Sequence, residues 1–274
     1  MTARRRETRG FTLIEVIVVI AVVSILASMA VPFVAKILDQ SREEATRKQM
    51  EEMHRAIMGD PKAPTIGYLA DMGRLPVTLA QLNTQGTQPG VTTVPPPTGL
   101  GIVRYGWQGQ YVNVGFSPAA YLTDGWGTNL AYNSPGAGQI RSAGADRVLG
   151  TSDDITYPSS AVVATGRLLV NLYVWRTDNT TSQYVLNPQP ASFPGMQLNV
   201  RVDYSNNGVR SAAPLSAGIP PGPLGPPYVL GPTHAGFHEV IATCTLPPNP
   251  QVGGQAVAYV PENNQQAQLN LYLR

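Results

Sequence analysis

The densest group of side chains that could do chemistry is an acidic loop at residues 142–155, SAGADRVLGTSDDI. Asp146, Asp153 and Asp154 lie there among glycines, and neighbouring carboxylates repel one another unless a cation or water separates them. Ca²⁺ takes six to eight oxygen ligands from carboxylates and backbone carbonyls. The spacing lacks the D-x-D-x-D-G run and the closing Glu of an EF-hand. The loop therefore predicts either an irregular calcium site or a solvated acidic turn in which Asp153 caps the segment that follows.

A second chemical feature is a single carboxylate at the start of a long apolar segment. Glu15 is followed by twenty residues without charge, 16–35, which as a helix would be long enough to cross a bilayer core. An ionised carboxylate inside a membrane costs roughly 2.5–3.5 kcal/mol and by default marks a functional position with a partner. The next basic residue along the helix, Lys36, is too distant. The partner must therefore come from another chain or from a free amine.

A cut between Gly10 and Phe11 would create such an amine. The new amine of Phe11 would lie at the membrane face, where it could pair with Glu15 of a neighbouring copy. Because this contact does not close on itself, its repetition would build a filament. A simple secretory signal peptide is the alternative, since arginines precede the apolar run and the letters SMA at 28–30 offer a cleavage site.

Charge is concentrated at the N-terminus. The first ten residues hold four arginines and one glutamate, a charge of +3, whereas the whole chain carries +2. Such a basic flank stays in the cytoplasm and places the C-terminal bulk outside. The remainder of the chain has no basic stripe, so nucleic acid is not an expected partner.

The letters RGFTLIEVIVVIAVVSILASMAVP at 9–32 closely resemble the prepilin signature of type IV pilins and type II secretion pseudopilins. The resemblance implies that a prepilin peptidase cuts after Gly10 and N-methylates Phe11, and that Glu15 guides assembly. Pro32 matches the family proline at which the helix unwinds locally in filaments. The implied partners are other copies and related pilins, the prepilin peptidase, an inner-membrane assembly platform, and membrane lipid before assembly.

The likeness extends to about residue 157. The segment YLTDGWGTNLAYN at 121–133 resembles the DPWG.PY.Y segment of major pseudopilins, with Gly125 in the place of the usual proline. The acidic loop resembles their calcium loop, with Arg147 in the place of a glycine. This resemblance implies that Asp146 and Asp153 are the side-chain ligands, with Asp154 as a further candidate and Ala143 and Thr151 as candidate carbonyl ligands. A bound Ca²⁺ would also serve a chain whose single cysteine excludes an internal disulfide.

Other candidate sites are weak. The chain holds no nucleophile elbow, zinc-helix motif, P-loop or dinucleotide fingerprint. His234 and His238 are four residues apart at the entry of an expected strand, which predicts no common face and no metal site. Cys244 is expected to be a buried small hydrophobe, and the three tryptophans are expected to pack rather than to form a sugar-stacking row.

The N-terminal half predicts one helix of nearly 50 residues, half in the membrane and half amphipathic. Its second half has an apolar face of Ala45, Met50, Met53 and Ile57 and ends at Gly59 before Asp60-Pro61. A short helix is expected at 78–82, and a turn followed by a strand at 121–133.

The C-terminal part alternates between apolar and polar residues in four runs, RLLVNLYVW, MQLNVRVDY, FHEVIATC and AQLNLYL. An Asn207-Gly208 pair after the second run is typical of a hairpin. These runs predict a β-sandwich at 161–274 that weakly resembles a transthyretin-like module. A stiff Gly- and Pro-rich loop is expected at 217–227.

We therefore expect an α+β chain: a cleaved leader at 1–10, a transmembrane and assembly helix at 11–38, a pilin-like part with the calcium loop at 39–160, and the sandwich at 161–274. The expected function is that of a non-catalytic filament subunit. Its precursor would lie in a bacterial inner membrane, with the globular part and the filament in the periplasm or at the cell surface. Two alternatives remain open: a filament-displayed adhesion or binding module at 161–274, and a membrane-anchored extracytoplasmic enzyme.

Overall fold

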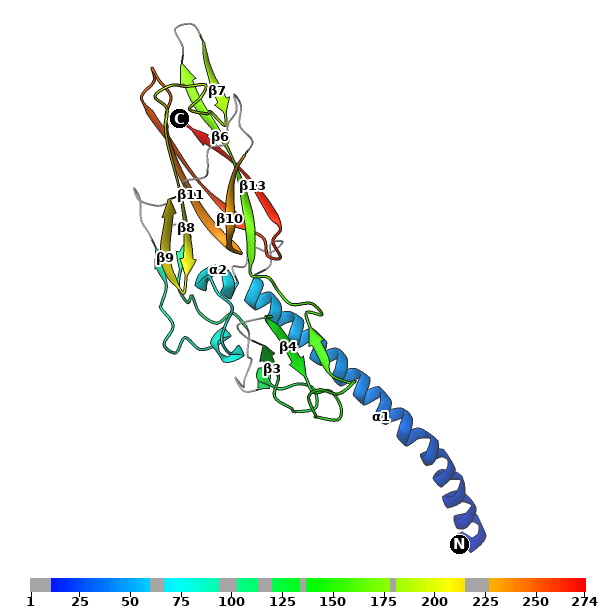
Figure 1. Cartoon of the computed structure of the whole chain (residues 1–274). Coiled ribbons are helices and arrows are strands. Elements are labelled where there is room, and N and C mark those ends of the chain that lie inside the picture. The colour runs from blue at the N-terminus through cyan, green and yellow to red at the C-terminus, as the bar shows by residue number, and fades with distance from the viewer. Residues whose placement is uncertain are drawn as a thin grey trace, which may run out of the picture.

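The computed structural model describes residues 11–59, 67–93, 103–112, 120–133, 137–177, 181–214 and 227–274. One long helix extends from the globular part, a small sheet lies along its C-terminal half, and two larger sheets lie beyond its C-terminal end (Figure 1). This order of elements confirms the α+β class.

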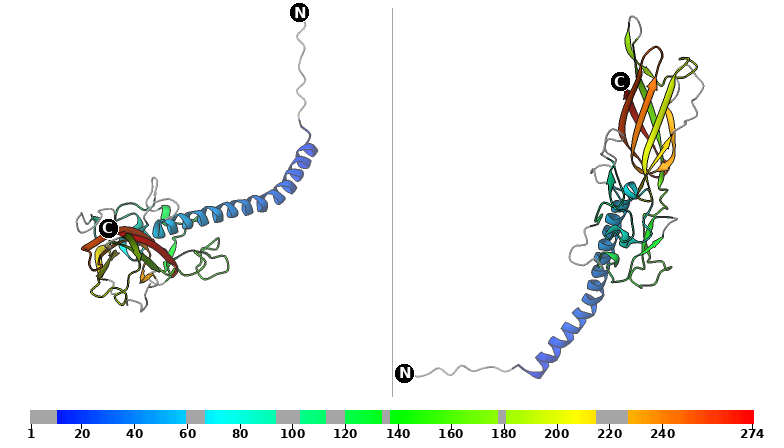
Figure 2. Two further views of the ribbon diagram at one scale, coloured as in Figure 1. Left: turned by 90° about the horizontal axis from the view of Figure 1, so that it is seen from above. Right: turned by 90° about the vertical axis from the view of Figure 1, so that its left-hand side faces the viewer.

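The long helix α1 spans Leu13–Met58 as a single element. It begins with a capping box, in which Thr12 and Glu15 satisfy each other's backbone N–H groups, and it ends at Gly59, whose N–H donates to the carbonyl of Arg55. The apolar N-terminal half is exposed throughout, and α1 is the one helix in the described part of the chain that is long and apolar enough to cross a membrane. Figure 2 shows the helix curving within this half.

The C-terminal half of α1 packs on the globular part through Thr46, Met50, Met53 and Ile57. The expected apolar face is corrected at one position, because Ala45 is exposed and Thr46 is buried. Positions 46, 50, 53 and 57 follow the four- and three-residue steps of one helix face, whereas 45 and 50 are five apart and point in different directions.

The small sheet and short helices form the pilin-like part. Strands β3 (Ala131–Asn133), β4 (Gln139–Ser142) and β5 (Ile155–Tyr157) pair antiparallel in that order. The remaining elements are short: α2 (Tyr68–Met72), the 3₁₀ helices η1 (Leu79–Leu82) and η2 (Ala120–Leu122), and the paired strands β1 (Thr92–Thr93) and β2 (Arg104–Tyr105). The helix expected at 78–82 is confirmed as η1, whereas the strand expected within 121–133 is limited to its last three residues.

The two larger sheets lie face to face over one apolar core. One has the order β10 (Tyr228–His234), β6 (Thr165–Thr177), β13 (Gln266–Leu273), with β7 (Ser182–Leu186) also paired to β6. The other has the order β12 (Gln251–Val260), β11 (Gly236–Thr245), β8 (Gln197–Asn206), β9 (Val209–Pro214). All pairs are antiparallel except β13 with β6. Inward-facing residues of both sheets form one buried cluster, which includes Val170, Leu172, Val240 and Cys244.

Four strands were expected from alternation, and β6, β8, β11 and β13 confirm them. The hairpin is also confirmed, because Asn206 pairs with Val209 around Asn207 and Gly208, both of which have positive φ. Strands β7, β10 and β12 were not anticipated, since two of them contain glycines that interrupt the pattern. The loop expected at 217–227 lies, except for Pro227, outside the described residues.

The helix α2 joins the pilin-like part to the larger sheets. Its C-terminal carbonyls, which no intrahelical donor can reach, accept N–H groups from outside: Gly106 donates to Asp71 at 2.9 Å, and Gly208 donates to Met72 at 2.8 Å. The hydroxyl of Ser205 also donates to the Asp71 carbonyl. A Cβ on Gly73 would lie 1.8 Å from the Ser205 carbonyl oxygen. The two halves therefore meet backbone against backbone.

Candidate functional site

The first candidate site is the start of α1, where a carboxylate stands alone among apolar side chains. The Oε2 atom of Glu15 accepts the backbone N–H of Thr12 at 2.8 Å and its hydroxyl at 2.8 Å. Among the described residues Glu15 forms no ion pair, which fits the expectation that its partner lies outside this chain. Phe11 is 88% exposed and precedes the cap. Gly10, the expected cleavage position, lies outside the described residues.

Pro32 lies inside α1, and the helix remains continuous around it. Its missing N–H leaves the carbonyl one turn earlier without a helical partner, so this position is a weak point of the helix. The local unwinding implied by the family resemblance concerns the filament and stays a prediction.

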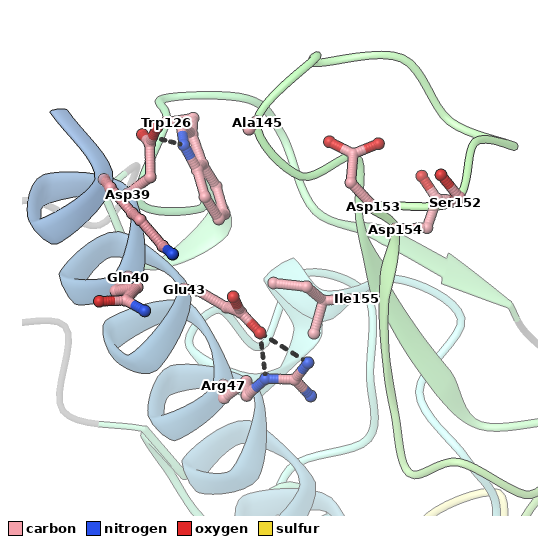
Figure 3. A pocket seen from close by; sticks show the side chains of 11 residues that line it. Asp39, Gln40, Glu43, Arg47, Trp126, Ala145, Ser152, Asp153, Asp154 and Ile155 are labelled. Atoms are coloured by element: carbon pink, nitrogen blue, oxygen red, sulfur yellow. Dashed lines mark hydrogen bonds and ion pairs between the residues drawn. The ribbon is translucent and has the colours of Figure 1, made fainter. Parts of the chain in front are cut away.

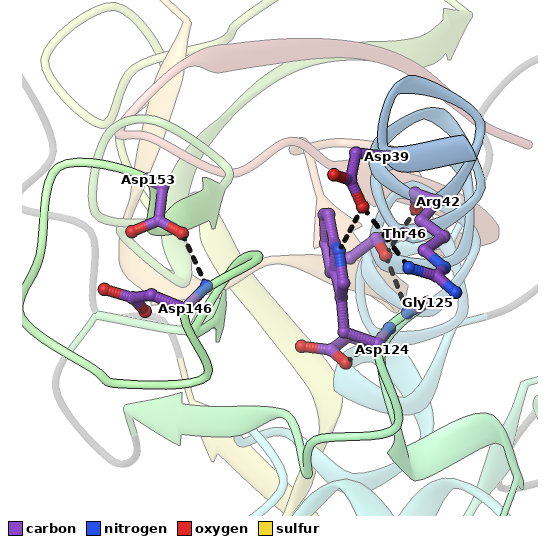
Figure 4. A network of polar contacts seen from close by, with 8 residues as sticks. Asp39, Arg42, Thr46, Asp124, Gly125, Asp146 and Asp153 are labelled. Carbon is purple, nitrogen blue, oxygen red and sulfur yellow. Dashed lines mark hydrogen bonds and ion pairs between the residues drawn. The ribbon is translucent and has the colours of Figure 1, made fainter. Parts of the chain in front are cut away.

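The second candidate site is the contact between α1 and the turn at 124–128 (Figure 4). Asp124 is buried, and its Oδ1 accepts the N–H groups of Trp126 at 3.0 Å and Thr128 at 2.8 Å, while its Oδ2 accepts the hydroxyl of Ser142 at 2.6 Å. Asp124 thus shapes the turn by satisfying its backbone donors. The indole N–H of Trp126 donates to Asp39 of α1 at 3.3 Å.

Gly125 brings this turn onto the helix. Its N–H donates to the hydroxyl of Thr46 at 2.9 Å, and that hydroxyl donates in turn to the carbonyl of Arg42 at 2.8 Å. A Cβ on Gly125 would lie 2.7 Å from the Arg42 carbonyl oxygen. A proline here would have neither the N–H nor the space, which explains why this chain has glycine where the family pattern has proline.

The acidic loop follows β4, beside this contact. Asp153 accepts the N–H of Asp146 at 3.0 Å and the hydroxyl of Thr151 at 2.6 Å. These bonds lower the pKa of Asp153, with the Thr151 hydroxyl as the largest cause, so the carboxylate is charged. The residue is also exposed to solvent. Asp146 accepts the N–H of Val148 at 2.8 Å. Arg147 adopts the left-handed conformation, with φ of 61°, that a glycine would take without cost.

Asp154 has different surroundings from Asp153. Its Oδ2 accepts hydrogen bonds from the guanidinium of Arg141 at 2.7 Å and from the N–H of Gly150 at 2.8 Å. The Asp154 side chain is nearly buried. Ala143 is buried, and the carbonyl of Thr151 accepts the N–H of Asp154 at 3.4 Å. Within the described residues no group of three or more Asp, Glu, His or Cys side chains is arranged as a metal site. Calcium binding by the loop stays a prediction, with Asp146 and Asp153 the better placed side chains.

A groove of about 570 Å³ separates α1 from the acidic loop (Figure 3). Its walls carry both signs of charge. Glu43 forms an ion pair with Arg47 at 2.8 Å on the helix wall, while Asp153 and Asp154 lie on the opposite wall. The groove is lined by residues of α1, of the 124–128 turn and of the loop: Lys36, Asp39, Gln40, Glu43, Arg47, Trp126, Ala145, Ser152, Asp153, Asp154 and Ile155.

Cys244 and His238, two of the remaining sequence candidates, have packing roles. Cys244 is buried, as expected. His238 is buried and bonded to Thr233 at 2.9 Å and to the Gly236 carbonyl at 3.1 Å. His234 and His238 each lie about 6 Å from the Tyr204 ring, and no direct contact joins the two histidines among the described residues. The glycine between them, Gly236, has φ of 128° and turns the chain at the boundary of β10 and β11.

Sequence reasoning missed several buried acidic groups, among them Asp71 and Asp203, which have partners that can be named. Asp71 of α2 accepts the Tyr111 hydroxyl at 2.8 Å and the Gln108 amide, and burial raises its pKa to about 7. Asp203 of β8 is fully buried and pairs with Arg201 and Arg210. A single acidic residue within an apolar pattern was the available signal in both segments.

Comparison with known proteins agrees with the geometry. The family model of the prokaryotic N-terminal methylation motif matches residues 5–31. The type II secretion system core protein G of Klebsiella michiganensis is 34% identical over 155 residues, which cover 56% of this chain and 94% of that protein. The chain belongs to the type II secretion pseudopilin and type IV pilin family. A second family member, core protein G of Escherichia coli K12, is 29% identical over 153 residues, 55% of this chain and 90% of that protein. No solved structure matches the chain.

These relatives are matched over almost their whole length, yet a little under half of this chain has no counterpart in them. The family resemblance drawn from the N-terminal letters is confirmed. The transthyretin-like character of the C-terminal part stays a prediction.

Proposed function

We propose that this chain is a structural, non-catalytic subunit of a type II secretion pseudopilus or a related type IV filament. The observation that supports this most directly is Glu15, a carboxylate without an ion-pair partner in the described chain, at the start of an exposed apolar helix. Phe11, whose amine would be free after processing, precedes the capping residue Thr12. The pairing of Glu15 with the Phe11 amine of another copy would satisfy both groups.

Assembly begins, in this proposal, from a precursor held in the inner membrane by α1. Prepilin peptidase cuts after Gly10 and N-methylates Phe11, and the assembly platform draws the helix out of the lipid. The loss of lipid around the exposed apolar residues of α1 is offset by their burial among neighbouring helices. The filament then consists of copies of this chain and related pilins, with the globular parts outside the cytoplasmic membrane.

We also propose that the acidic loop holds one Ca²⁺ through Asp146 and Asp153, with Asp154, Ala143 and Thr151 as the further predicted ligands. The chemistry of the donors supports it, since the backbone N–H of Asp146 donates to the charged carboxylate of Asp153 and so holds the two residues together. The ion would fix the loop against the 124–128 turn and α1.

A second candidate function is the display of a binding module. The two larger sheets support it, because they form a separate apolar core at the end of the molecule away from the N-terminal half of α1 (Figure 1). This function is compatible with the first, since a filament subunit can carry such a module outward.

The test of the filament proposal is the substitution Glu15→Ala. We expect normal membrane insertion and a loss of filament incorporation, because removal of the carboxylate lowers the cost of insertion but deletes the partner of the Phe11 amine. Ser24→Ala is the matched control, since it removes another polar side chain from the same exposed apolar segment. Filament yield is measured in sheared fractions against membrane content. Equal yields from wild type and Glu15→Ala would contradict the pairing.

A further inference from the structure

The outer face of the β10–β6–β13 sheet carries a connected cluster of aromatic rings. Tyr173 and Tyr272, which are paired in register across β6 and β13, stack with ring centres 4.7 Å apart. Tyr184 of β7 contacts Tyr272 at 5.4 Å and Trp175 at 4.9 Å in edge-to-face geometry. Tyr272 is 54% exposed and Tyr184 is 39% exposed. Exposed aromatic clusters of this kind mark interaction surfaces.

The same face continues as a row of amides along β13. Residues 266, 268 and 270 are Gln, Gln and Asn, and all three are exposed on the side of the strand that carries Tyr272. Asn270 accepts the amide of Asn171 at 3.0 Å on β6. Amides supply both donors and acceptors, as recognition of hydroxyl groups requires. The rings and amides together form one strip that runs along β6 and β13.

The charged side chains on the strands of this sheet are all basic, and Glu262 lies in the turn that leads into β13. The strands β6, β7, β10 and β13 contain no Asp or Glu. Exposed arginines lie at both ends of the strip: Arg167 is the register partner of Gln266, and the guanidinium of Arg274 lies 5.6 Å from the ring centre of Trp175. A ligand with an apolar ring face, many hydroxyls and carboxylates would match all three features, whereas a basic partner would be repelled.

We propose that this face binds an acidic polysaccharide, whose sugar rings stack on the aromatic cluster while its carboxylates contact the two arginines. The inference rests on the second candidate function, the display of a binding module, and does not depend on filament assembly. It names the ligand class of that module: a uronic-acid polymer rather than a protein. The surface lies on a sheet beyond the C-terminal end of α1, far from the N-terminal half of that helix, through which a subunit would assemble (Figure 1).

The test uses the full chain in a detergent without a sugar headgroup, with short alginate oligosaccharides as the probe. Dextran, a neutral sugar polymer, and polyglutamate, an acidic polymer without sugar rings, are the comparison ligands. We expect measurable binding of alginate, weaker binding of dextran and none of polyglutamate. Tyr272→Ala should weaken alginate binding roughly two- to tenfold, while Tyr272→Phe should retain it. Arg274→Gln should weaken it and reduce its dependence on salt.

Val209→Ala, an exposed apolar truncation on the other sheet, is the matched control and should bind as wild type does. Unchanged melting temperatures exclude misfolding of the variants. Equal binding of polyglutamate would overturn the proposal, because charge alone would then explain the result. Absence of alginate binding together with self-association that Tyr272→Ala abolishes would assign the face to contacts between copies, and would retain an interaction module but not the sugar. If the chain neither binds alginate nor self-associates through this face, the binding module is overturned as well.

Discussion

At the scale of single residues, the chemistry of this chain depends on a few carboxylates whose surroundings differ. Glu15 is exposed at a helix start, Asp124 is buried among backbone donors, Asp154 is paired with Arg141, and Asp153 is charged and open to solvent. Of these four, Asp153 combines a charge with room for a ligand beside it. Identical or similar side chains therefore differ in burial, charge and hydrogen bonding according to their neighbours, and the proposed assembly and calcium roles of Glu15 and Asp153 follow from those differences.

Processing is predicted to leave Phe11 as the first residue, carrying an N-methyl group. The reason is the Gly10-Phe11 step before the capping box, which resembles the family cleavage site. Mass spectrometry of the mature N-terminus decides it, and Gly10→Val, which should block the cut, is compared with Thr2→Val upstream. A mature chain that starts after Ala30 would instead indicate a secretory signal.

Calcium is predicted to raise the melting temperature of the wild-type chain in detergent relative to a chelator-treated sample. A ligand that binds only the folded state stabilises it by about 2.7 kcal/mol at a hundredfold excess over Kd. Asp153→Ala should lose most of this response, whereas Glu52→Ala on the exposed side of α1 should keep it. If wild type melts alike in both buffers, the loop is a solvated acidic turn.

At the scale of elements, the contact between α1 and the 124–128 turn is predicted to tolerate no side chain at its centre. Gly125→Ala should destabilise the fold by about 1–3 kcal/mol, because its Cβ would meet the Arg42 carbonyl oxygen at 2.7 Å. Gly253→Ala is the control, since a Cβ there makes only ordinary contacts at 3.6 Å. Thermal melts measure the stability of both variants. Equal stability would contradict the close approach of Gly125 to α1.

The sequence predicted elements well where a pattern is long and periodic. The helix α1, the hairpin at Asn207-Gly208 and four strands of the larger sheets were all found this way. Strand β12 was missed because Gly253 and Gly254 interrupt its alternation. Thr46 was missed because a threonine on a helix face reads as polar, although its hydroxyl is satisfied by Gly125 and Arg42. Sequence spacing finds the faces of elements, but it does not find which long-range partner satisfies a buried polar group.

The candidate site shows the same division. Glu15 was found from its isolation in an uncharged run, and the acidic loop from its composition. The different surroundings of Asp153 and Asp154 were not predictable, because they depend on the position of Arg141 in β4 across the loop. The pairing of Trp126 with Asp39 joins residues 87 positions apart and left no local signal.

At the scale of the whole molecule, stability is predicted to depend on pH through Asp71, at the junction of the two halves. Its pKa is about 7 in the folded state and 3.8 in the unfolded chain, so the folded state binds the extra proton. The contribution of this proton to the free energy of unfolding is fully present below the unfolded-state pKa. It is lost as pH rises toward 7, by up to about 1.4 kcal/mol per pH unit.

Asp71→Asn removes this titration. Its stability relative to wild type should therefore increase as pH rises from 5 to 7, with little further change at pH 8. Melting curves at each pH measure the difference, in which the histidines shared by both proteins cancel. Ser24→Ala, which changes an exposed side chain without a titratable group, should run parallel to wild type. Parallel curves for Asp71→Asn would show that the buried carboxyl stays ionised.

The backbone contacts around α2 also limit how such a chain could be rebuilt. Gly73 lies against Ser205, and Gly236 lies so close to Ala70 that a Cβ on the glycine would be 2.6 Å from the Ala70 Cα atom. A graft of the two larger sheets onto another pseudopilin would therefore have to carry α2 and both glycines with it as one cassette. A graft that begins at residue 161 would separate Ser205 and Gly208 from the α2 carbonyls to which they donate. The transplanted sheets would then be joined to the new host by the chain connection without these hydrogen bonds.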